Sequence, residues 1–299
     1  METLTPVQPK EKTSFKLPRV LFPKIIQIET TVLCNSACTF CPQNEMTRGP
    51  RFMEEWIWKK IVDQTRGRGI TYRPFMINEP FVDPNLAKII AYIKEDPTAI
   101  VEFNSYAHMT AKTDIEGIIA AGGDIVRFSI DGFTQETYNQ SGRGGSLERM
   151  VNNVLKFIAE RDRQGSSCHI EVRMINMDFN KHEREDFLKF WNEHADEAII
   201  TDLYEWPWTG QTTFEPKPCL KVVEEMFFMT DGQATLCCWD SHERGIIGDI
   251  RTHSVEEIWL GVKMQQYKQW LSKGERGNIL LCSKCDAYKN HDFTDFEGY

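Results

Sequence analysis

The chain has 299 residues, of which 41% are hydrophobic, enough to bury the core of one large domain with a small appendage. Its formal net charge of -9 and its lack of a basic patch argue against nucleic acid or an anionic membrane as a partner. Residues 1–20 lack the apolar core of a signal peptide, and no apolar run approaches the roughly 20 residues of a membrane span. We therefore expect a cytoplasmic protein that acts on a small polar molecule or a peptide.

Apolar, β-rich runs alternate with helical patterns through the first two thirds of the chain. The expected strands span residues 24–30, 72–77, 100–104, 125–130, 169–175 and 198–204. The expected helices span residues 53–65, 85–94, 114–121, 147–161 and 184–194. This alternation predicts an α/β fold, a partial (β/α)6 barrel that is left open, with active residues at the carboxyl ends of the parallel strands.

The pattern changes after about residue 210. Two β-rich runs, 225–229 and 233–238, flank Asp231-Gly232, a strong hairpin signal. We therefore expect three parts: an N-terminal tail over 1–20, the partial barrel over 21–210 and a smaller unit over 211–299.

Three cysteines, Cys34, Cys38 and Cys41, directly follow the first expected strand. In a reducing compartment, cysteine clusters are expected to bind metal rather than to form disulfides. A 4Fe-4S cluster takes four thiolates, so a loop that supplies three leaves one iron open for chemistry. Zinc is the alternative, but zinc sites typically show paired Cys-x-x-Cys knuckles with four ligands at hand.

This spacing, with Phe40 just before the third cysteine, resembles the radical S-adenosylmethionine (SAM) superfamily. The resemblance implies that the amino and carboxylate groups of SAM chelate the open iron. It also implies that the reduced cluster cleaves SAM to a 5'-deoxyadenosyl radical, which abstracts hydrogen from a substrate.

Further residues resemble the family's SAM contacts at successive strand ends. The run 77–80 is similar to the Gly-Gly-Glu-Pro motif, although both glycines are replaced, so Asn78 and Glu79 are expected to receive the SAM ammonium. Ser129 resembles the fourth-strand serine that contacts the cofactor, and Arg143 is placed to pair with the SAM carboxylate. Asn104 ends the third strand and is expected near the ribose. The alternative role for these polar residues is to cap the following helices.

Residues two apart on a strand share a face. Gln27 and Glu29 therefore lie on one face of the first strand, and Glu171 and Arg173 lie on one face of the fifth. If these faces point into the barrel, their charges must be paired or hydrated, and a substrate pocket can use them. Arg173 is the candidate to bind a substrate hydroxyl or carboxylate or to assist proton transfer. A salt bridge from Arg173 to Glu171 or Glu29 is the alternative.

Four later cysteines, Cys219, Cys237, Cys282 and Cys285, provide enough thiolates to close a second cubane. Their arrangement resembles the SPASM/Twitch extension of radical SAM enzymes, and the lack of further cysteines after Cys285 is typical of a Twitch unit. Their offsets of 18, 45 and 3 resemble those of the amino-cyclitol dehydrogenases of butirosin biosynthesis. The resemblance therefore implies two 4Fe-4S clusters and SAM as cofactors.

A fully ligated auxiliary cluster can only store or pass electrons, which favours oxidation of a carbinol to a ketone in an amino-sugar, cyclitol or sugar. One alternative is an epimerase in which a thiol returns a hydrogen atom. Cys238 is the candidate thiol, because strand alternation would send its sulfur away from that of Cys237, although it can equally be an inert core residue. Another alternative is a peptide maturase. An external donor such as flavodoxin or ferredoxin is expected to supply electrons.

Overall fold

The computed structural model describes residues 15–46, 48–49, 52–109, 113–203 and 217–285. Its strands are β1 (Ile25–Ile28), β2 (Thr71–Arg73), β3 (Ile100–Ser105), β4 (Ile125–Ser129), β5 (His169–Asn176), β6 (Glu197–Asp202), β7 (Glu225–Phe228), β8 (Gln233–Thr235) and β9 (Ile246–Asp249). Its α-helices are α1 (Glu55–Asp63), α2 (Leu86–Lys94), α3 (Ile115–Ala120), α4 (Gln135–Gln140), α5 (Leu147–Gln164), α6 (Arg184–His194), α7 (Leu220–Glu224), α8 (Val255–Trp259) and α9 (Val262–Ser272).

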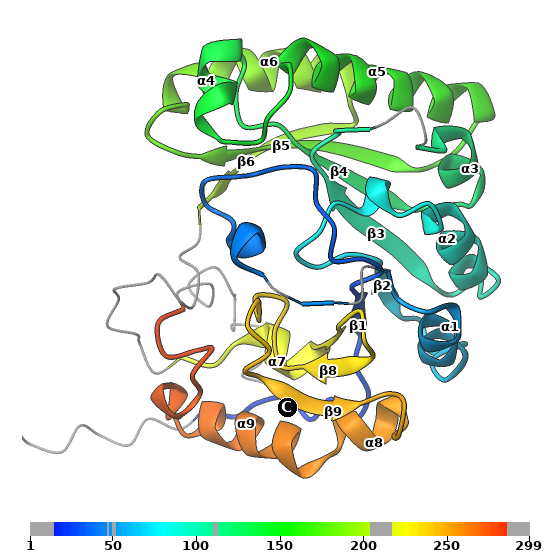
Figure 1. Cartoon of the computed structure of the whole chain (residues 1–299), viewed down its shortest axis with the longest axis vertical. Coiled ribbons are helices and arrows are strands. Elements are labelled where there is room, and N and C mark those ends of the chain that lie inside the picture. Colours follow the sequence, from blue (N-terminus) through cyan, green and yellow to red (C-terminus); the bar gives the residue numbers. More distant parts are fainter. Residues whose placement is uncertain (1–14, 47, 50–51, 110–112, 204–216, 286–299) are drawn as a thin grey trace, which may run out of the picture.

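One nine-stranded sheet runs through the molecule in the order β6-β5-β4-β3-β2-β1-β7-β8-β9 (Figure 1). Strands β1 to β6 pair in parallel with their neighbours. Strand β7 also pairs in parallel with β1, whereas β8 and β9 continue antiparallel. Among the described residues β6 and β9 are the outermost strands, so the sheet is not closed, which confirms the predicted open α/β architecture. The predicted hairpin around Asp231-Gly232 forms between β7 and β8 and extends the barrel sheet.

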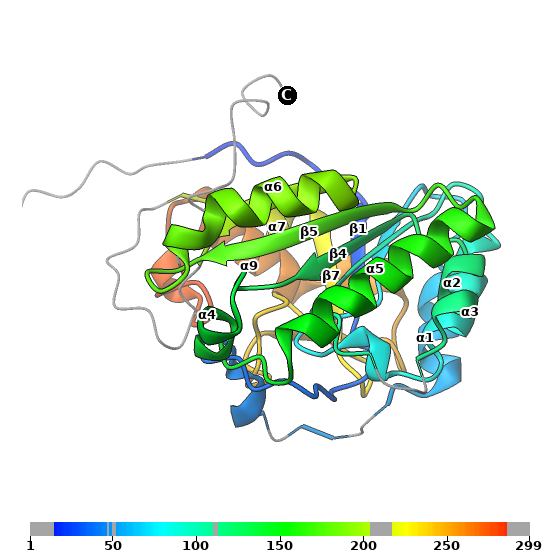
Figure 2. The same ribbon diagram turned by 90° about the horizontal axis from the view of Figure 1, so that it is seen from above.

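The two faces of the sheet differ in chemistry because side chains alternate along each strand. One face is apolar and packs under the outer helices: α5 and α6 lie above β4 and β5 in Figure 1, and in the view from above (Figure 2) β5 runs between these two helices. Its buried residues include Ile26, Tyr72, Phe103, Val126 and Val172, each at most 1% exposed. The opposite face, called the inner face below, carries polar and charged side chains.

The helices α7, α8 and α9 and the strand β9 of the C-terminal part were not predicted, and two features of the barrel also differ from the sequence prediction. The second strand ends at Arg73 rather than at residue 77, because Pro74 has no N–H to continue the ladder and turns the chain toward Glu79. Helix α4 was not predicted, and it is only six residues long. Thr134 caps it, since the Thr134 hydroxyl accepts a hydrogen bond from the Thr137 N–H.

The predicted division between residues 210 and 211 lies outside the described residues, as do residues 1–14 of the predicted tail. Within the described ranges, no helix is both long enough and apolar enough to cross a lipid bilayer.

Candidate active site

The three N-terminal cysteines surround one cavity of about 190 Å³ at the carboxyl ends of the barrel strands. Cys34, Cys38 and Cys41 all line it. The lining also includes every residue predicted to contact SAM, namely Phe40, Asn78, Glu79, Asn104, Ser129 and Arg143. The structure thus brings together nine predicted residues from the cysteine loop and from the segments after β2, β3 and β4.

The cysteine loop is fixed by main-chain hydrogen bonds to the segment before α5. The Ala37 N–H donates to the Gly142 carbonyl over 3.3 Å, and the Thr39 N–H donates to the Ser141 carbonyl over 3.0 Å. Gly142 has a φ of +74°, and an added Cβ would lie 2.6 Å from the Ala37 carbonyl oxygen. This position therefore requires glycine for both its backbone conformation and its close approach to the loop.

The donor set of the cavity fits a metal cluster. Burial raises the pKa of Cys34 to about 12 and that of Cys41 to about 11. Since thiolates rather than thiols bind metal, cluster binding has to displace these protons. Within the described parts of the chain, no three Cys, His, Asp or Glu side chains converge closely enough for a single metal ion. Three thiols spaced around a cavity instead suit a group several atoms wide, such as a 4Fe-4S cluster.

Glu79 is fully enclosed at the base of the cavity, with 1% of its surface exposed. Its carboxylate accepts hydrogen bonds from the Ser105 hydroxyl over 2.8 Å and from the Phe81 and Tyr106 N–H groups over 3.0 Å each. Burial nevertheless raises its pKa to about 7. Glu79 also caps the short 3-10 helix Pro80–Val82. The capping role that was considered as an alternative is therefore confirmed, and Glu79 lines the cavity as well.

Asn78 supplies a buried hydrogen-bond donor that has no partner among the residues that the structure describes. Its Oδ1 accepts a hydrogen bond from the Met76 N–H over 2.8 Å, whereas its Nδ2 is buried and unpaired. A buried donor without a partner costs free energy, and a bound polar group can satisfy it. The Asn78 amide therefore fits the amino-acid end of SAM, even though it replaces a glycine of the family motif.

Arg143 is buried beside two aromatic rings of the cavity. Its guanidinium carbon lies 5.6 Å from the centroid of Phe40 and 5.9 Å from that of Tyr106, and the guanidinium forms an ion pair with Asp131. The predicted partner of SAM is thus held in place by a carboxylate that the sequence analysis did not single out.

Asn104 and Ser129 reach the cavity from neighbouring strands. In the parallel register, Asn104 of β3 pairs with Arg127, and Ser129 of β4 pairs with Arg173, so these residues share the inner face. The α3 helix is capped by Asp114 rather than by Asn104. The capping alternative is therefore wrong for Asn104.

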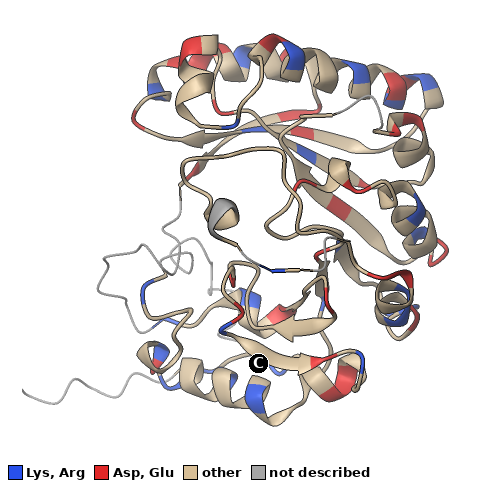
Figure 3. Cartoon of the chain, viewed as in Figure 1, with Lys and Arg blue, Asp and Glu red and all other residues tan. Residues whose placement is uncertain are grey.

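Seven charged side chains of alternating sign cross the inner face and form what we call the charge ladder. In spatial order they are Lys221, Glu225, Arg73, Glu102, Arg127, Glu171 and Arg173. Figure 3 shows charged positions of both signs across these strands. Arg173 therefore pairs with Glu171, one of the two alternatives predicted, while it also occupies the end of the ladder.

Glu102 is the central carboxylate of the charge ladder. It lies 2.5 Å from the Nε of Arg73 and 2.8 Å from the Nη1 of Arg127. Burial works to raise its pKa, but the charges of the two arginines prevail and lower the pKa below the usual value. The inner face is thus polar, and each charge of the ladder has a partner of opposite sign, which is the condition for charged groups at a partly buried surface.

Glu29, which was predicted to face inward like Glu171, is not part of the charge ladder. It is fully buried and binds both Nη atoms of Arg48, over 2.8 and 2.7 Å, and the hydroxyl of Thr230 over 2.9 Å. This pair ties the chain after the cysteine loop to the end of β7. Arg173 does not bind Glu29.

The four C-terminal cysteines converge from three segments. Cys219 precedes α7, Cys237 follows β8, and Cys282 and Cys285 follow the 3-10 helix η4 (Arg276–Asn278). The Cys282 thiol lies within electrostatic reach of Cys219 and Cys285, and the Cys237 thiol within that of Cys285. Cys219, Cys282 and Cys285 are each less than 10% exposed. The structure thus gathers the four predicted auxiliary ligands, whose assignment as ligands stays a prediction.

The position of Cys238 differs from the sequence expectation. Strand alternation does not apply to it, because β8 ends at Thr235, and its thiol and that of Cys237 influence each other electrostatically. Cys238 also has electrostatic contacts with Lys221, Glu225 and Arg73, at one end of the charge ladder. The expectation that its sulfur lies away from that of Cys237 is therefore wrong.

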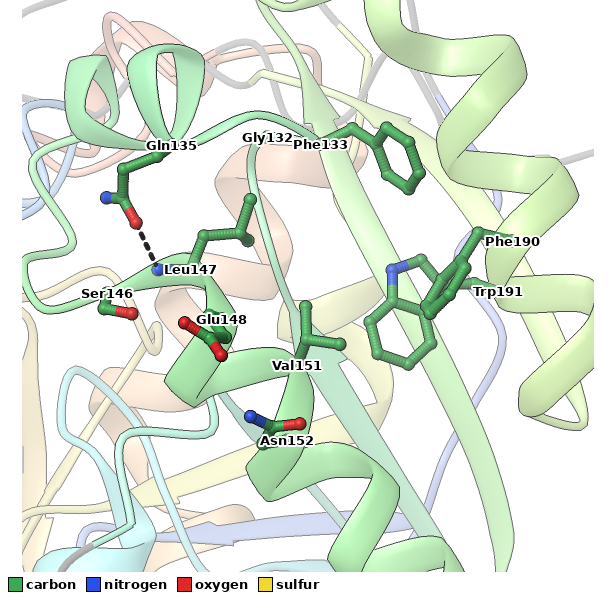
Figure 4. A pocket seen from close by; sticks show the side chains of 10 residues that line it. All are labelled: Gly132, Phe133, Gln135, Ser146, Leu147, Glu148, Val151, Asn152, Phe190 and Trp191. Carbon is green, nitrogen blue, oxygen red and sulfur yellow. Dashed lines mark hydrogen bonds between the residues drawn. The ribbon is translucent and has the colours of Figure 1, made fainter.

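A second cavity, of about 450 Å³, lies in the helical layer and contains none of the predicted site residues. Phe133 and the α6 residues Phe190 and Trp191 face the first turns of α5 across it, and Gln135 of α4 accepts a hydrogen bond from the Leu147 N–H over 2.7 Å (Figure 4). Its lining holds one acidic residue, Glu148, and no cysteine or histidine. It therefore lacks the donors of the cysteine cavity.

Comparison with known proteins agrees with this site. The sequence model of the radical SAM superfamily matches residues 28–190, and that of the SPASM iron-sulfur cluster-binding domain matches residues 219–286. GTP 3',8-cyclase of Chlorobaculum tepidum is 21% identical over 172 residues, which cover 56% of this chain and 50% of that protein. The chain spans half or less of the length of the curated relatives that it matches.

Solved structures share the fold at low sequence identity. BtrN, crystallised in complex with AdoMet (SAM) and 2-DOIA, superposes with a TM-score of 0.64 and 14% identity over 89% of this chain and 93% of BtrN. SuiB of Streptococcus suis, crystallised with its precursor peptide SuiA, superposes with a TM-score of 0.67 and 11% identity over 88% of this chain and 72% of SuiB.

The match to the superfamily model covers more than half of the sequence, so this chain belongs to the radical SAM superfamily. It is a radical SAM enzyme with a C-terminal SPASM domain, and this membership implies SAM and 4Fe-4S clusters as its cofactors.

Proposed function

We propose that this enzyme abstracts a hydrogen atom from a C–H bond of a small polar substrate, an amino-sugar, cyclitol or sugar, and oxidises a carbinol to a ketone. The observation that carries the proposal is the polar inner face, where the charge ladder ends at Arg173, the register partner of the cavity residue Ser129. Fixed charges and hydrogen-bonding groups of this kind suit a hydroxylated substrate.

Around the cavity, each side chain has a proposed task. Cys34, Cys38 and Cys41 hold the catalytic cluster. Glu79 receives the ammonium group of SAM, Arg143 binds its carboxylate, and Asn78 donates to its amino-acid end. Asn104 and Ser129 contact the remainder of the cofactor, and Phe40 packs beside Arg143.

The cofactors, when bound, supply an adenosyl radical that takes the C–H hydrogen and, at the auxiliary cluster held by Cys219, Cys237, Cys282 and Cys285, an acceptor for the second electron. The hydroxyl proton is left for the protein. Arg173 binds the substrate oxygen, and Glu171, hydrogen-bonded to Arg173, receives that proton. The balance is one hydrogen atom, one electron and one proton, which together convert the carbinol to the ketone.

The likeness to BtrN supports a small polar substrate, because the two chains match over nearly their whole lengths and BtrN was crystallised with 2-DOIA. A peptide substrate is the competing proposal, supported by the likeness to SuiB and its peptide SuiA. In either case a one-electron donor such as flavodoxin or ferredoxin reduces the catalytic cluster. We expect the enzyme to work in a reducing compartment such as the cytoplasm, because cysteines that hold iron-sulfur clusters have to stay reduced.

A second candidate reaction is epimerisation. It is supported by the thiol of Cys238, which contacts the end of the charge ladder and so could return a hydrogen atom to a substrate radical on the inner face. Epimerisation leaves the substrate mass unchanged, whereas dehydrogenation removes two hydrogens.

The test uses the anaerobically reconstituted holoenzyme with SAM, a reductant and a panel of amino-cyclitols, amino-sugars and peptides, including 2-DOIA. We expect 5'-deoxyadenosine together with a product about two mass units lighter than one of the polyols, from the loss of two hydrogens. When the substrate carries deuterium at the carbon that is oxidised, this deuterium is expected to be transferred to 5'-deoxyadenosine. Turnover of peptides alone would refute the proposal. A product that has the mass of the substrate in H2O and takes up one deuterium in D2O would also refute it.

A further inference from the structure

One arginine is buried inside the C-terminal cysteine site. Arg276 belongs to η4, nine residues before Cys285, and only 1% of its surface is exposed, so it is among the largest fully buried side chains of the described chain. A buried guanidinium needs acceptors for its donors. The contacts of Arg276 show what its acceptors are.

The guanidinium of Arg276 joins the segments that carry the auxiliary cysteines. Its Nε donates to the Cys282 carbonyl over 3.0 Å, and its Nη2 donates to the Cys285 carbonyl over 3.4 Å. Its Nη1 donates to the Lys217 carbonyl over 3.0 Å, two residues before Cys219. One planar fork thus fixes the Cys282–Cys285 turn against the chain that leads to Cys219.

The charge of Arg276 acts on the same cysteines. Its hydrogen bonds to the main-chain carbonyls of Cys282 and Cys285 place the guanidinium beside the turn that carries both thiols. Because the site is buried, water screens this charge weakly. A cluster gains one negative charge on reduction, and a nearby fixed cation favours the reduced form, since the potential of an iron-sulfur cluster depends on local charge and exposure.

We propose that Arg276 is a positioning residue of the auxiliary site: its fork holds the Cys282–Cys285 turn, and its charge raises the reduction potential of the auxiliary cluster so that the cluster can take an electron from the substrate. This inference rests on the proposed function in assigning a cluster to the four C-terminal cysteines. It adds a residue that touches neither substrate nor SAM and that sets the driving force of the oxidation.

Three substitutions separate the two roles. Arg276→Met removes both the fork and the charge, and Arg276→Gln keeps amide donors without the charge. Arg276→Lys keeps the charge, but one ammonium cannot reproduce the planar fork. Arg251→Met is the matched control, because Arg251 is exposed and pairs with Asp249 at the end of β9.

The experiment is an EPR-monitored redox titration of the full chain carrying Cys34→Ala, Cys38→Ala and Cys41→Ala, so that only the auxiliary cluster contributes. Arg276→Met and Arg276→Gln are expected to lower the ratio of reduced to oxidised cluster at least tenfold at a fixed potential, a downward shift of about 59 mV or more. Arg276→Lys is expected to stay within about threefold of the parent at the same potential, with less iron retained, and Arg251→Met to change neither quantity.

Intact clusters with an unchanged potential in both neutral variants would overturn the inference. If neither neutral variant retains iron, Arg276→Lys provides the test of the charge. A tenfold lower ratio of reduced to oxidised cluster than in the parent would show that the charge does not set the potential. A parent chain that holds no iron after these three substitutions would instead refute the auxiliary cluster and with it the proposed function. If Arg276→Met and Arg276→Gln lower the potential as expected but the wild-type holoenzyme oxidises no substrate, the result would count against the proposed function alone.

Discussion

The carboxylate of Asp131 binds the guanidinium of Arg143 through a single oxygen that accepts from both Nε, over 2.6 Å, and Nη2, over 2.5 Å. The other oxygen of Asp131 accepts from the Ile175 N–H over 2.8 Å. Asp131 is fully buried, so this carboxylate sets the position of Arg143 from the ends of β4 and β5. The residue proposed to bind the SAM carboxylate is thus oriented by the barrel itself.

Asp131→Asn is expected to weaken SAM binding roughly tenfold. Arg143 loses the carboxylate that holds its guanidinium, so it no longer points steadily toward the cavity. Isothermal titration calorimetry on the reconstituted holoenzyme measures this loss. Asp162→Asn is the control, since Asp162 is exposed and pairs with Arg161 at the surface. Unchanged SAM affinity in Asp131→Asn would contradict the role given to Arg143.

Glu79 is expected to make the stability of the apo protein depend on pH. Burial raises its pKa from 4.5 to about 7, so between these values the folded state holds a proton that the unfolded state has released. The contribution of Glu79 to the free energy of unfolding therefore falls as pH rises through this window, by about 3 kcal/mol in total.

Urea denaturation of the wild type and of Glu79→Gln at pH 5 and pH 8 tests this expectation. The stability of the wild type relative to the variant is expected to fall from pH 5 to pH 8. Glu116→Gln, which changes an exposed carboxylate, is expected to show no such trend. A relative stability that stays constant, or rises, with pH would contradict the raised pKa.

Glu102→Gln is expected to lower the free energy of unfolding by roughly 3 kcal/mol, because the buried Glu102 is the shared partner of the half-buried arginines Arg73 and Arg127. Urea denaturation of the apo protein provides the measurement. Glu160→Gln, at a surface pair with Arg163, is the matched control and is expected to cost much less. Equal losses in both variants would show that the charge ladder is not a coupled buried network.

Cys238→Ala is expected to leave substrate oxidation intact, because the proposed reaction returns no hydrogen atom to the substrate. Mass spectrometry of the product, with Cys168→Ala as a second buried cysteine for control, decides the point. If Cys238→Ala still forms 5'-deoxyadenosine but no longer forms the normal product, the thiol is a hydrogen donor and the epimerase is the better account.

The sequence predicted the cavity well because parallel strands end at one edge. Cys34, Asn104 and Ser129 each stand at or just after a strand end, and the open barrel then brings them around one cavity whatever the detailed packing. The end of β2 was less predictable, because Pro74 interrupts a run of otherwise β-rich residues.

Contacts that depend on strand register could not be derived from the sequence. Glu102 and Arg127 stand in apolar runs, and only the alignment of β3 with β4 shows that they form an ion pair across the inner face. Cys238 was misplaced for a related reason, since alternation was extended beyond the end of β8. Arg276 gave no sequence signal, because its acceptor Lys217 lies 59 residues away.

The most direct test of the account is iron and 5'-deoxyadenosine measured on the same anaerobically reconstituted protein, with and without Cys34→Ala, Cys38→Ala and Cys41→Ala. We expect about eight irons per chain in the wild type, the content of two cubane clusters, and SAM cleavage once the protein is reduced. The triple variant is expected to keep about half of the iron and to form no 5'-deoxyadenosine. Zinc in place of iron, or SAM cleavage that survives the triple substitution, would contradict the central claim that these three cysteines hold the catalytic cluster.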